Sequence, residues 1–277
     1  MHSSSILGFV SAFVASASAT GVLLPLYVYP SAVYNDGAAN WKPVFDAVSA
    51  HPSVPWSVVV DPHNGPGLSG LPGDNDANYI SGVSQLNAYS NVKTIGYVRT
   101  NYATSSMDEL KKNITQWHDW STYTGADIAV DGIFFDESTD NFSYLNEAIT
   151  FARTTFGSNP ITTICNFGAT APAEYYSICD IVIAFESCLN CVGAPQYQSQ
   201  TTISANIPSG YEPLAAVIVH DFTGAAYDGS IADASLLATY LNTLKSDNVG
   251  WAYFCSAGYD SITTGPATVG QVAQDLA

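Results

Sequence analysis

The stretch Val130-Asp131-Gly132-Ile133-Phe134-Phe135-Asp136-Glu137 contains a continuous apolar run that leads directly into two adjacent carboxylates. An apolar run of this length, with polar residues at both ends, is typical of a strand that is buried on both faces. Burying one carboxylate without partners costs free energy, and burying two costs more. We therefore expect Asp136 and Glu137 to serve chemistry at the end of a buried strand.

Seven further apolar runs lie along the chain, and most are separated by stretches with the apolar spacing of helices. The additional strands are predicted at residues 21–29, 57–61, 94–98, 161–165, 180–185, 214–219 and 249–254. Helices are predicted at residues 41–51, 77–89, 106–123, 141–156, 231–245 and 267–276. Eight buried strands that alternate with helices predict an α/β fold, a (β/α)₈ TIM barrel, which commonly has about 250 residues.

A doubly wound sheet is the main alternative to the barrel. That fold would place a glycine-rich turn after the first strand, but the turn here is Pro30-Ser31-Ala32. The sequence shows neither an internal repeat nor a linker that would divide it. We therefore expect residues 20–277 to form one barrel domain.

The amino-terminal residues 1–19 are predicted to be a signal peptide. Residues 6–15 are apolar, and small residues follow at 15–19 as a cleavage region. No later apolar run approaches the about 20 residues that a transmembrane helix needs. Two acceptor sequons, at Asn113 and Asn141, predict glycosylation. We expect a secreted, extracellular protein, either free or associated with a cell wall.

The charge balance limits the kinds of partner. There are 24 acidic and 7 basic residues, so the net charge is −17, which argues against a nucleic acid or an anionic membrane as partner. A neutral or cationic ligand suits such a surface. The 17 Tyr and 5 Trp can supply the flat rings on which sugars stack. The expected partner is a polysaccharide, bound by a monomer.

The cysteine pattern predicts a local disulfide and no metal. The chain has five cysteines: Cys165, Cys179, Cys188, Cys191 and Cys255. Cys188 and Cys191 are expected to form a disulfide, because no second Cys or His pair follows at zinc spacing. The odd count leaves a thiol, and Cys165 or Cys255 could be the buried free one.

Other reaction chemistries lack their motifs. No Gly-x-Ser-x-Gly elbow is present, and the phosphate-binding loop motif is absent as well. His63, His118 and His220 are not spaced as metal ligands. We expect no metal and no cofactor.

Polar residues follow the carboxyl ends of the predicted strands. In a barrel these ends converge on one face, where barrel enzymes place their active sites. The predicted catalytic residues are Asp136, Glu137 and Glu186. The predicted substrate-binding residues are Tyr27, Tyr29, Asp61, His63, Asn64, Arg99, Asn101, Tyr102, Asn166, His220 and Asp221.

Paired carboxylates of this kind indicate glycoside hydrolysis. One carboxyl protonates the leaving oxygen, while the other attacks the sugar or activates water. We expect Asp136 to point inward and Glu137 to reach over from the rim, since neighbouring strand residues face opposite sides. Retention and inversion both stay open. Two other functions also stay open: a non-catalytic glycan-binding protein of the wall or matrix, and a hydrolase of another neutral polysaccharide.

Four long strings carry a resemblance to a known family. They are residues 24–30 (LPLYVYP), 60–67 (VDPHNGPG), 91–103 (NVKTIGYVRTNYA) and 132–137 (GIFFDE). On these strings the chain resembles the spherulin-4 family, glycoside hydrolase family 135. The resemblance implies a TIM barrel that cleaves galactosaminogalactan, a fungal exopolysaccharide containing N-acetylgalactosamine, in the manner of an endo-α-1,4-N-acetylgalactosaminidase.

The resemblance also implies roles for the acids. The family's Asp-Glu pair on the fourth strand maps onto Asp136 and Glu137, and its later Glu maps onto Glu186. In an α-linked sugar the 2-acetamido group is cis to the leaving group and cannot attack from behind, so protein carboxylates are expected to act alone. Glu137 is then the candidate acid/base, Asp136 the nucleophile or charge stabiliser, and Glu186 the other partner.

Overall fold

The computed structural model of the protein describes residues 19–257 and 268–277. The predicted signal peptide therefore lies outside the described residues, apart from residue 19. Within the described part of the chain, no helix combines the length and the apolar character that crossing a bilayer requires.

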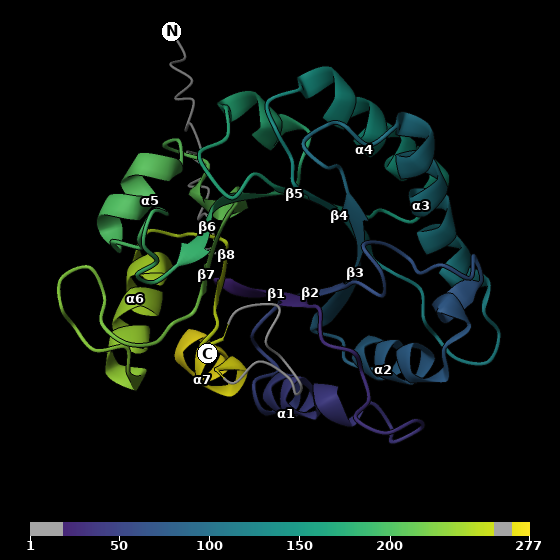
Figure 1. Ribbon diagram of the computed structural model, residues 1–277, viewed down its shortest axis with the longest axis horizontal. Coiled ribbons are helices and arrows are strands. Elements are labelled where there is room, and N and C mark those ends of the chain that lie inside the picture. The colour runs from purple at the N-terminus through teal and green to yellow at the C-terminus, as the bar shows by residue number, and fades with distance from the viewer. Residues whose placement is uncertain (1–18, 258–267) are drawn as a thin grey trace, which may run out of the picture.

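Eight parallel strands form a closed ring in chain order, with the last strand paired to the first (Figure 1). The strands are β1 (Gly21–Leu26), β2 (Trp56–Val60), β3 (Val92–Arg99), β4 (Gly132–Asp136), β5 (Thr162–Asn166), β6 (Ile181–Cys188), β7 (Ala215–His220) and β8 (Trp251–Phe254). The predicted (β/α)₈ barrel is confirmed.

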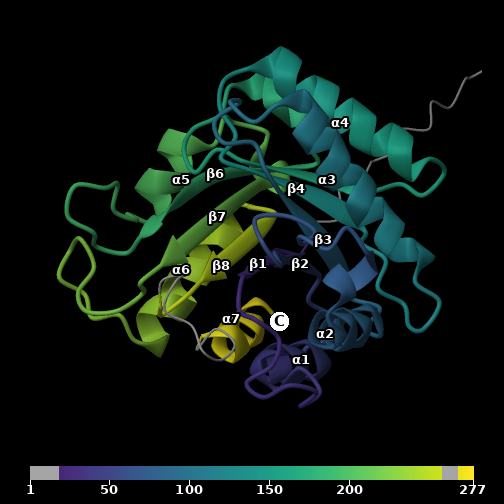
Figure 2. The ribbon, with the colours of Figure 1, turned by 45° about the vertical axis from the view of Figure 1, so that its right-hand side comes forward.

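The helices lie around the outside of this ring, as Figures 1 and 2 show from two directions. They are α1 (Lys42–Ala50), α2 (Ala77–Asn87), α3 (Met107–Asp119), α4 (Phe142–Phe156), α5 (Gln200–Asn206), α6 (Ala234–Ser246) and α7 (Val269–Leu276). Short 3₁₀ helices are η1 (Ala39–Trp41), η2 (Pro72–Asn75), η3 (Trp120–Thr122), η4 (Ala173–Ser177) and η5 (Glu212–Leu214).

Most element bounds differ by a few residues from the sequence prediction, and three elements show the reasons. β1 ends at Leu26, three residues early, because its register partner Val60 is the last residue of β2 and offers no backbone beyond that point. α5 was not predicted, since seven residues hold too few turns for a clear apolar period. The last helix was predicted from residue 267, which lies outside the described residues, and α7 begins at Val269.

The core has two parts because strand side chains alternate between the two faces of the sheet. One set fills the barrel interior in layers. Its buried members are Leu23, Val59, Ile95, Tyr97, Phe134, Ile164, Ile181, Ile183, Ala216 and Ile218. The other, larger set packs between the strands and the surrounding helices. Polar residues that follow the interior set along their strands are therefore directed into the carboxyl mouth.

Helix α3 lies unusually close to β3. Gly96 faces Trp117, and any side chain at Gly96 would collide with the indole ring. The indole Nε1 of Trp117 donates a hydrogen bond of 2.7 Å to the carbonyl of Tyr97. This contact fixes the last turns of α3 against the middle of β3.

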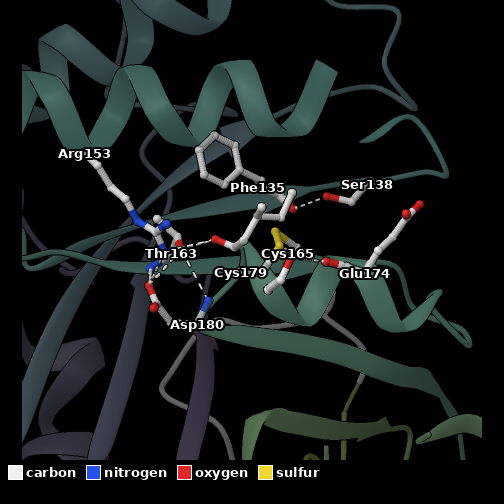
Figure 3. The surroundings of a disulfide bond; sticks show 10 residues. Phe135, Ser138, Arg153, Thr163, Cys165, Glu174, Cys179 and Asp180 are labelled. Atoms are coloured by element: carbon white, nitrogen blue, oxygen red, sulfur yellow. Dashed lines mark hydrogen bonds and ion pairs between the residues drawn. A yellow bond between two sulfur atoms is a disulfide. The ribbon is translucent and has the colours of Figure 1, made fainter. Parts of the chain in front are cut away.

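The cysteines form two disulfides and leave one thiol. Cys165 on β5 is bonded to Cys179, just before β6 (Figure 3), so the suggestion that Cys165 is a free thiol was wrong. The sequence could not reveal this bond because it depends on how the segment with η4 returns the chain from β5 to β6. Cys188 and Cys191 are bonded to each other, and Cys255 is the buried free cysteine.

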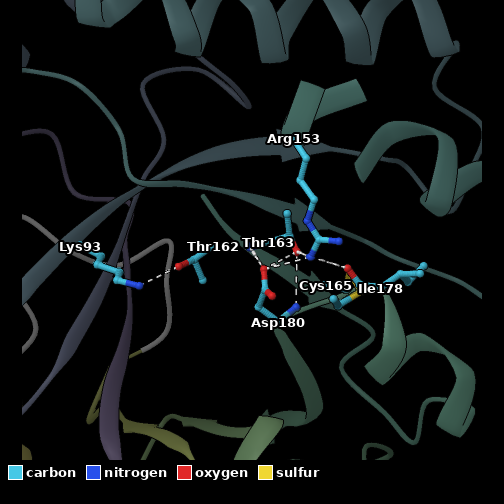
Figure 4. A network of polar contacts seen from close by, with 8 residues as sticks. Lys93, Arg153, Thr162, Thr163, Cys165, Ile178 and Asp180 are labelled. Carbon is cyan, nitrogen blue, oxygen red and sulfur yellow. Dashed lines mark hydrogen bonds and ion pairs between the residues drawn. A yellow bond between two sulfur atoms is a disulfide. The ribbon is translucent and has the colours of Figure 1, made fainter. Parts of the chain in front are cut away.

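A polar network reinforces the same two strands at their amino ends. Arg153 of α4 donates to Thr163 Oγ1 (3.0 Å), to Asp180 Oδ2 (3.2 Å) and to the carbonyl of Ile178 (3.0 Å) (Figure 4). Asp180 also accepts from the backbone N–H of Thr163 at 2.8 Å. These contacts, with the disulfide, hold β5 and β6 in a fixed relation.

Candidate active site

The three predicted catalytic acids meet in one cavity at the carboxyl ends of the strands. The cavity has a volume of about 240 Å³ and is open to solvent. Its lining consists of Tyr27, Tyr102, Asp136, Glu137, Asn166, Phe167, Gly168 and Glu186. Within the described residues, no group of three His, Cys, Asp or Glu side chains is arranged to hold a metal ion.

Asp136 is the most enclosed of the acids. It continues the interior row of β4 after Phe134, so its carboxylate points into the barrel mouth. The Tyr97 hydroxyl donates to Oδ2 at 2.5 Å, and Asn166 Nδ2 donates to Oδ1 at 2.7 Å. Burial raises the pKa of Asp136, while these two hydrogen bonds pull it downward. Both oxygens thus accept hydrogen bonds in the way that an ionised carboxylate requires.

Glu186 reaches the same cavity because of an irregularity in β6. Ile181 and Ile183 belong to the barrel interior, so strict alternation would turn residue 186 outward. The pairing register with β7 shifts between Ile183 and Phe185, and Ala184 and Phe185 both pack on the helix side. This bulge reverses the alternation and directs Glu186 inward.

One amide joins the two interior acids. Asn166 Nδ2 lies 2.7 Å from Asp136 Oδ1 and 2.6 Å from Glu186 Oε2, so these oxygens are at most about 5.3 Å apart. The Oδ1 atom of Asn166 accepts the N–H of Gly168 at 2.9 Å, which fixes the orientation of the amide. Two carboxylates this close repel each other.

Glu137 occupies the rim and is held by its own partners. Its φ of 52° lies in the left-handed region, which turns the side chain back towards the cavity instead of onto the opposite face of β4. Arg99 binds the carboxylate through Nε (2.7 Å) and Nη2 (3.0 Å). The Thr100 hydroxyl donates to the carbonyls of both Asp136 and Glu137. Strain of this kind, about 1–3 kcal/mol per residue, persists only where neighbours enforce it.

The loop after β3 shows the same strain. Asn101, Tyr102 and Ala103 all have positive φ values, between 50° and 61°. The Tyr102 N–H donates to the carbonyl of Glu137 at 2.9 Å, which ties this loop to the acidic dipeptide. The exposed Tyr102 ring therefore stands at the edge of the cavity, where a sugar could stack on it.

Asp61 lies next to the cavity without lining it. Burial raises the pKa of Asp61 to about 6, the Gly65 N–H opposes that rise through a hydrogen bond of 2.8 Å, and the charge of Asp136 adds to it. Asp61 therefore belongs to the electrostatic surroundings of Asp136.

The raised pKa of Asp61 predicts a stability effect. The folded protein holds the Asp61 proton more tightly than the unfolded chain, so the stability from this group is complete below about pH 4 and is lost as the pH rises through 6. Asp61→Asn, which keeps the acceptor for Gly65, should therefore raise the free energy of unfolding at pH 8 by up to about 3 kcal/mol. Urea unfolding at pH 4 and pH 8 measures this difference.

The matched control is Asp46→Asn, which removes an exposed carboxylate paired with Lys42 on α1. It should change the free energy of unfolding by less than about 1 kcal/mol at both pH values. An Asp61→Asn variant that is less stable than the wild type at pH 8 would contradict the prediction.

The remaining predicted binding residues do not line this cavity. The Tyr29 hydroxyl donates to Asp76 at 2.8 Å and accepts from Asn78, on the side of α2. His220 and Asp221 contact each other at 2.9 Å at the end of β7. His63, Asn64, Arg99 and Asn101 line neighbouring cavities instead.

Sequence reasoning missed three residues of the site. Tyr97 was counted as part of an apolar strand, although its hydroxyl is the donor to Asp136. A tyrosine two positions before Arg99, on the same strand face, was the available signal. Phe167 and Gly168 line the cavity directly after Asn166, and no pattern in the sequence marked them.

The two glycosylation sequons lie in different surroundings. Asn141 is exposed and caps α4, where its Oδ1 accepts the N–H of Tyr144. Asn113 lies within α3 and lines a cavity.

The fold and these side chains define a (β/α)₈ barrel with an acid-lined pocket at its carboxyl face. The chain belongs to spherulation-specific family 4, whose family model matches residues 21–274. This confirms the resemblance found in the sequence.

Two relatives support the assignment. Spherulin-4 of Physarum polycephalum is 26% identical over 230 residues, which cover 81% of this chain and 62% of that protein, so the chain spans less than two thirds of its relative. The crystal structure of Aspergillus clavatus Sph3 in complex with GalNAc superposes with a TM-score of 0.75 at 25% identity, and covers 94% of this chain and 98% of that one.

Proposed function

We propose that this protein is a secreted, endo-acting glycoside hydrolase that cleaves α-1,4 linkages in an N-acetylgalactosamine-containing polysaccharide, galactosaminogalactan. The observation that carries the proposal is the pair of acids, Asp136 and Glu186, bridged by one amide in an open pocket. The similar Sph3 protein was crystallised with GalNAc, which supports this sugar as the unit recognised here.

The spacing of the two acids favours a retaining reaction. Retaining glycosidases hold their carboxyl groups about 5–5.5 Å apart, whereas inverting enzymes leave about 6.5–9.5 Å for a water molecule. The separation of at most about 5.3 Å between Asp136 Oδ1 and Glu186 Oε2 lies below the range of inverting enzymes. We assign Asp136 as nucleophile, because both of its oxygens accept hydrogen bonds, and Glu186 as acid/base.

The reaction then has two balanced steps. Asp136 forms a bond to the anomeric carbon as the glycosidic C–O bond breaks, and the Glu186 proton passes to the leaving oxygen. Water next attacks the anomeric carbon, gives a proton to Glu186 and releases Asp136 as a carboxylate. The enzyme returns to its starting state with one linkage hydrolysed.

Glu137 receives a different role from the acid/base expected on family grounds. It is bound at two points by Arg99, and that ion pair requires a carboxylate. A group that donates a proton in every cycle would have to break the pair each time. We assign Glu137 to charge stabilisation and positioning at the rim.

Secretion is part of the proposal. The apolar segment at residues 6–15 and the small residues after it fit a signal peptide. The Cys165–Cys179 and Cys188–Cys191 bonds suit an oxidising compartment. Both observations support an extracellular site of action.

The direct test is to incubate the purified protein with galactosaminogalactan and a panel of other neutral polysaccharides, and to size the products over time. We expect galactosaminogalactan to shorten rapidly into mid-length fragments, as internal cleavage requires. Binding to the polymer without any shortening would indicate the non-catalytic glycan-binding protein instead. Cleavage of a different polysaccharide alone would move the substrate assignment to that glycan.

A further inference from the structure

A second hollow adjoins the catalytic pocket on the side of the β2 and β3 loops. Two cavities of about 320 and 380 Å³ share Asn64, Glu109 and Asn113 in their linings, so they form one continuous depression, here called the α3 trough. Arg99 and Asn101 line its end nearer the acids. Gln116 lines the far end.

Helix α3 supplies one wall of this trough. Glu109, Asn113 and Gln116 are spaced as i, i+4 and i+7, so they share one helix face. The adjacent face carries Leu110 and Ile114, which are fully buried. The polar face is therefore directed at the loops across the trough, and no packing requirement explains its composition.

The carboxamides around the trough are available to a ligand. The side chains of Asn64, Asn101 and Asn113 donate no hydrogen bond to, and accept none from, any residue within 19–257 or 268–277. A carboxamide offers donors and an acceptor in one plane, which matches the donor and acceptor of a sugar hydroxyl. Asn64 and Asn101 are also held at φ values of 49° and 50°, and strained backbone of this kind gathers at functional sites.

Arg99 joins the trough to the catalytic pocket. Its Nε and Nη2 bind Glu137, which lines the pocket, while the same side chain lines the trough. A polymer that enters the pocket can therefore continue past this ion pair without leaving the surface. The geometry is that of neighbouring sites along one chain.

We propose that the α3 trough binds a further, neutral sugar unit of the same polysaccharide chain, beyond the unit held by the catalytic acids. This inference rests on the proposed hydrolase function and extends it to a residue set on α3. The binding groups are the carboxamides of Asn64, Asn101 and Asn113, which bond to ring hydroxyls. The trough thus strengthens the binding of long substrates, which reach it, relative to short ones, which do not.

The trough proposal also predicts which of the two sequons carries a glycan. A glycan attached to Asn113 Nδ2 would fill the trough and replace one of the two N–H donors of the amide. Asn141, by contrast, is exposed at the start of α4. We therefore expect protein secreted from a fungal host to carry a glycan at Asn141 and none at Asn113, as measured by mass spectrometry of glycopeptides.

The test compares two variants on oligosaccharides of increasing length. Asn113→Ala removes the amide and the sequon together, and alanine suits the helix interior. Thr115→Ala, the matched control, removes the sequon and keeps the amide. For Asn113→Ala we expect kcat/KM to fall about tenfold on long oligosaccharides and to stay unchanged on the shortest substrate cleaved. Thr115→Ala should match the wild type at every length.

The other outcomes would overturn either the trough proposal alone or the hydrolase function together with it. Equal rates for both variants and the wild type at all lengths, an equal loss at all lengths, or a glycan on Asn113 in active protein would overturn the trough proposal alone. A wild-type protein that cleaves no polysaccharide would overturn the hydrolase function, and the trough proposal with it.

Discussion

Asp136→Asn should lower the turnover of the polysaccharide by about 10⁴-fold or more, while the fold and the affinity for the substrate are retained. The amide has nearly the shape of the carboxylate, but it cannot form the bond to the anomeric carbon. Losing a nucleophile removes a whole reaction route, which typically costs several powers of ten in kcat. Turnover is measured by reducing-end release, and affinity by calorimetry with a polymer fragment.

The matched control for this variant lies on the same strand. Asp131→Asn makes the same chemical change just before the amino end of β4, where Asp131 accepts the Thr94 N–H at 2.9 Å. This variant should keep wild-type turnover because it is at the opposite end of the barrel from the pocket. Asp136→Asn protein that keeps more than about a tenth of the wild-type rate would refute the nucleophile assignment.

Glu186→Gln should show a loss that depends on the leaving group. On the natural polymer the rate should fall about 10²–10⁴-fold, because no acid protonates the departing oxygen. On an oligosaccharide with an activated aryl leaving group the first step needs little proton transfer, so it should remain fast. Azide, which attacks without a general base, should restore turnover and yield a glycosyl azide of retained configuration.

Glu174→Gln serves as the control, since Glu174 is exposed on η4 and does not line the catalytic pocket. It should respond neither to the leaving group nor to azide. If Glu186→Gln lost the same factor on both substrates and azide had no effect, Glu186 would not be the acid/base. Azide rescue of Glu137→Gln instead would return that role to the rim residue.

Much of the barrel could be predicted because its strands are buried on both faces. Each appears in the sequence as a short apolar run, as in residues 130–137, and the helices between them show their own period. Barrel geometry alone places the carboxyl ends of β4 and β6, and so Asp136 and Glu186, at the same mouth of the barrel. The end of β1 could not be predicted, because it depends on where β2 stops offering backbone partners.

The finer parts of the site depend on three-dimensional detail that leaves no pattern. The inward direction of Glu186 results from one bulge in β6, and simple alternation predicts the opposite face. Tyr97 looked like a core residue because its ring packs in the barrel interior. Only its hydroxyl reaches Asp136. Asn113 was interpreted as a sequon, since only the packing of α3 on β3 shows that it lines a cavity.

The central claim, a covalent reaction at Asp136 assisted by Glu186, is tested most directly by peptide mapping of the Glu186→Gln variant after mixing with the activated oligosaccharide. Without its base the variant should accumulate the glycosyl-enzyme. Mass spectrometry should find the sugar attached to Asp136. Attachment to Glu137, or a first product of inverted configuration with no adduct at all, would contradict it.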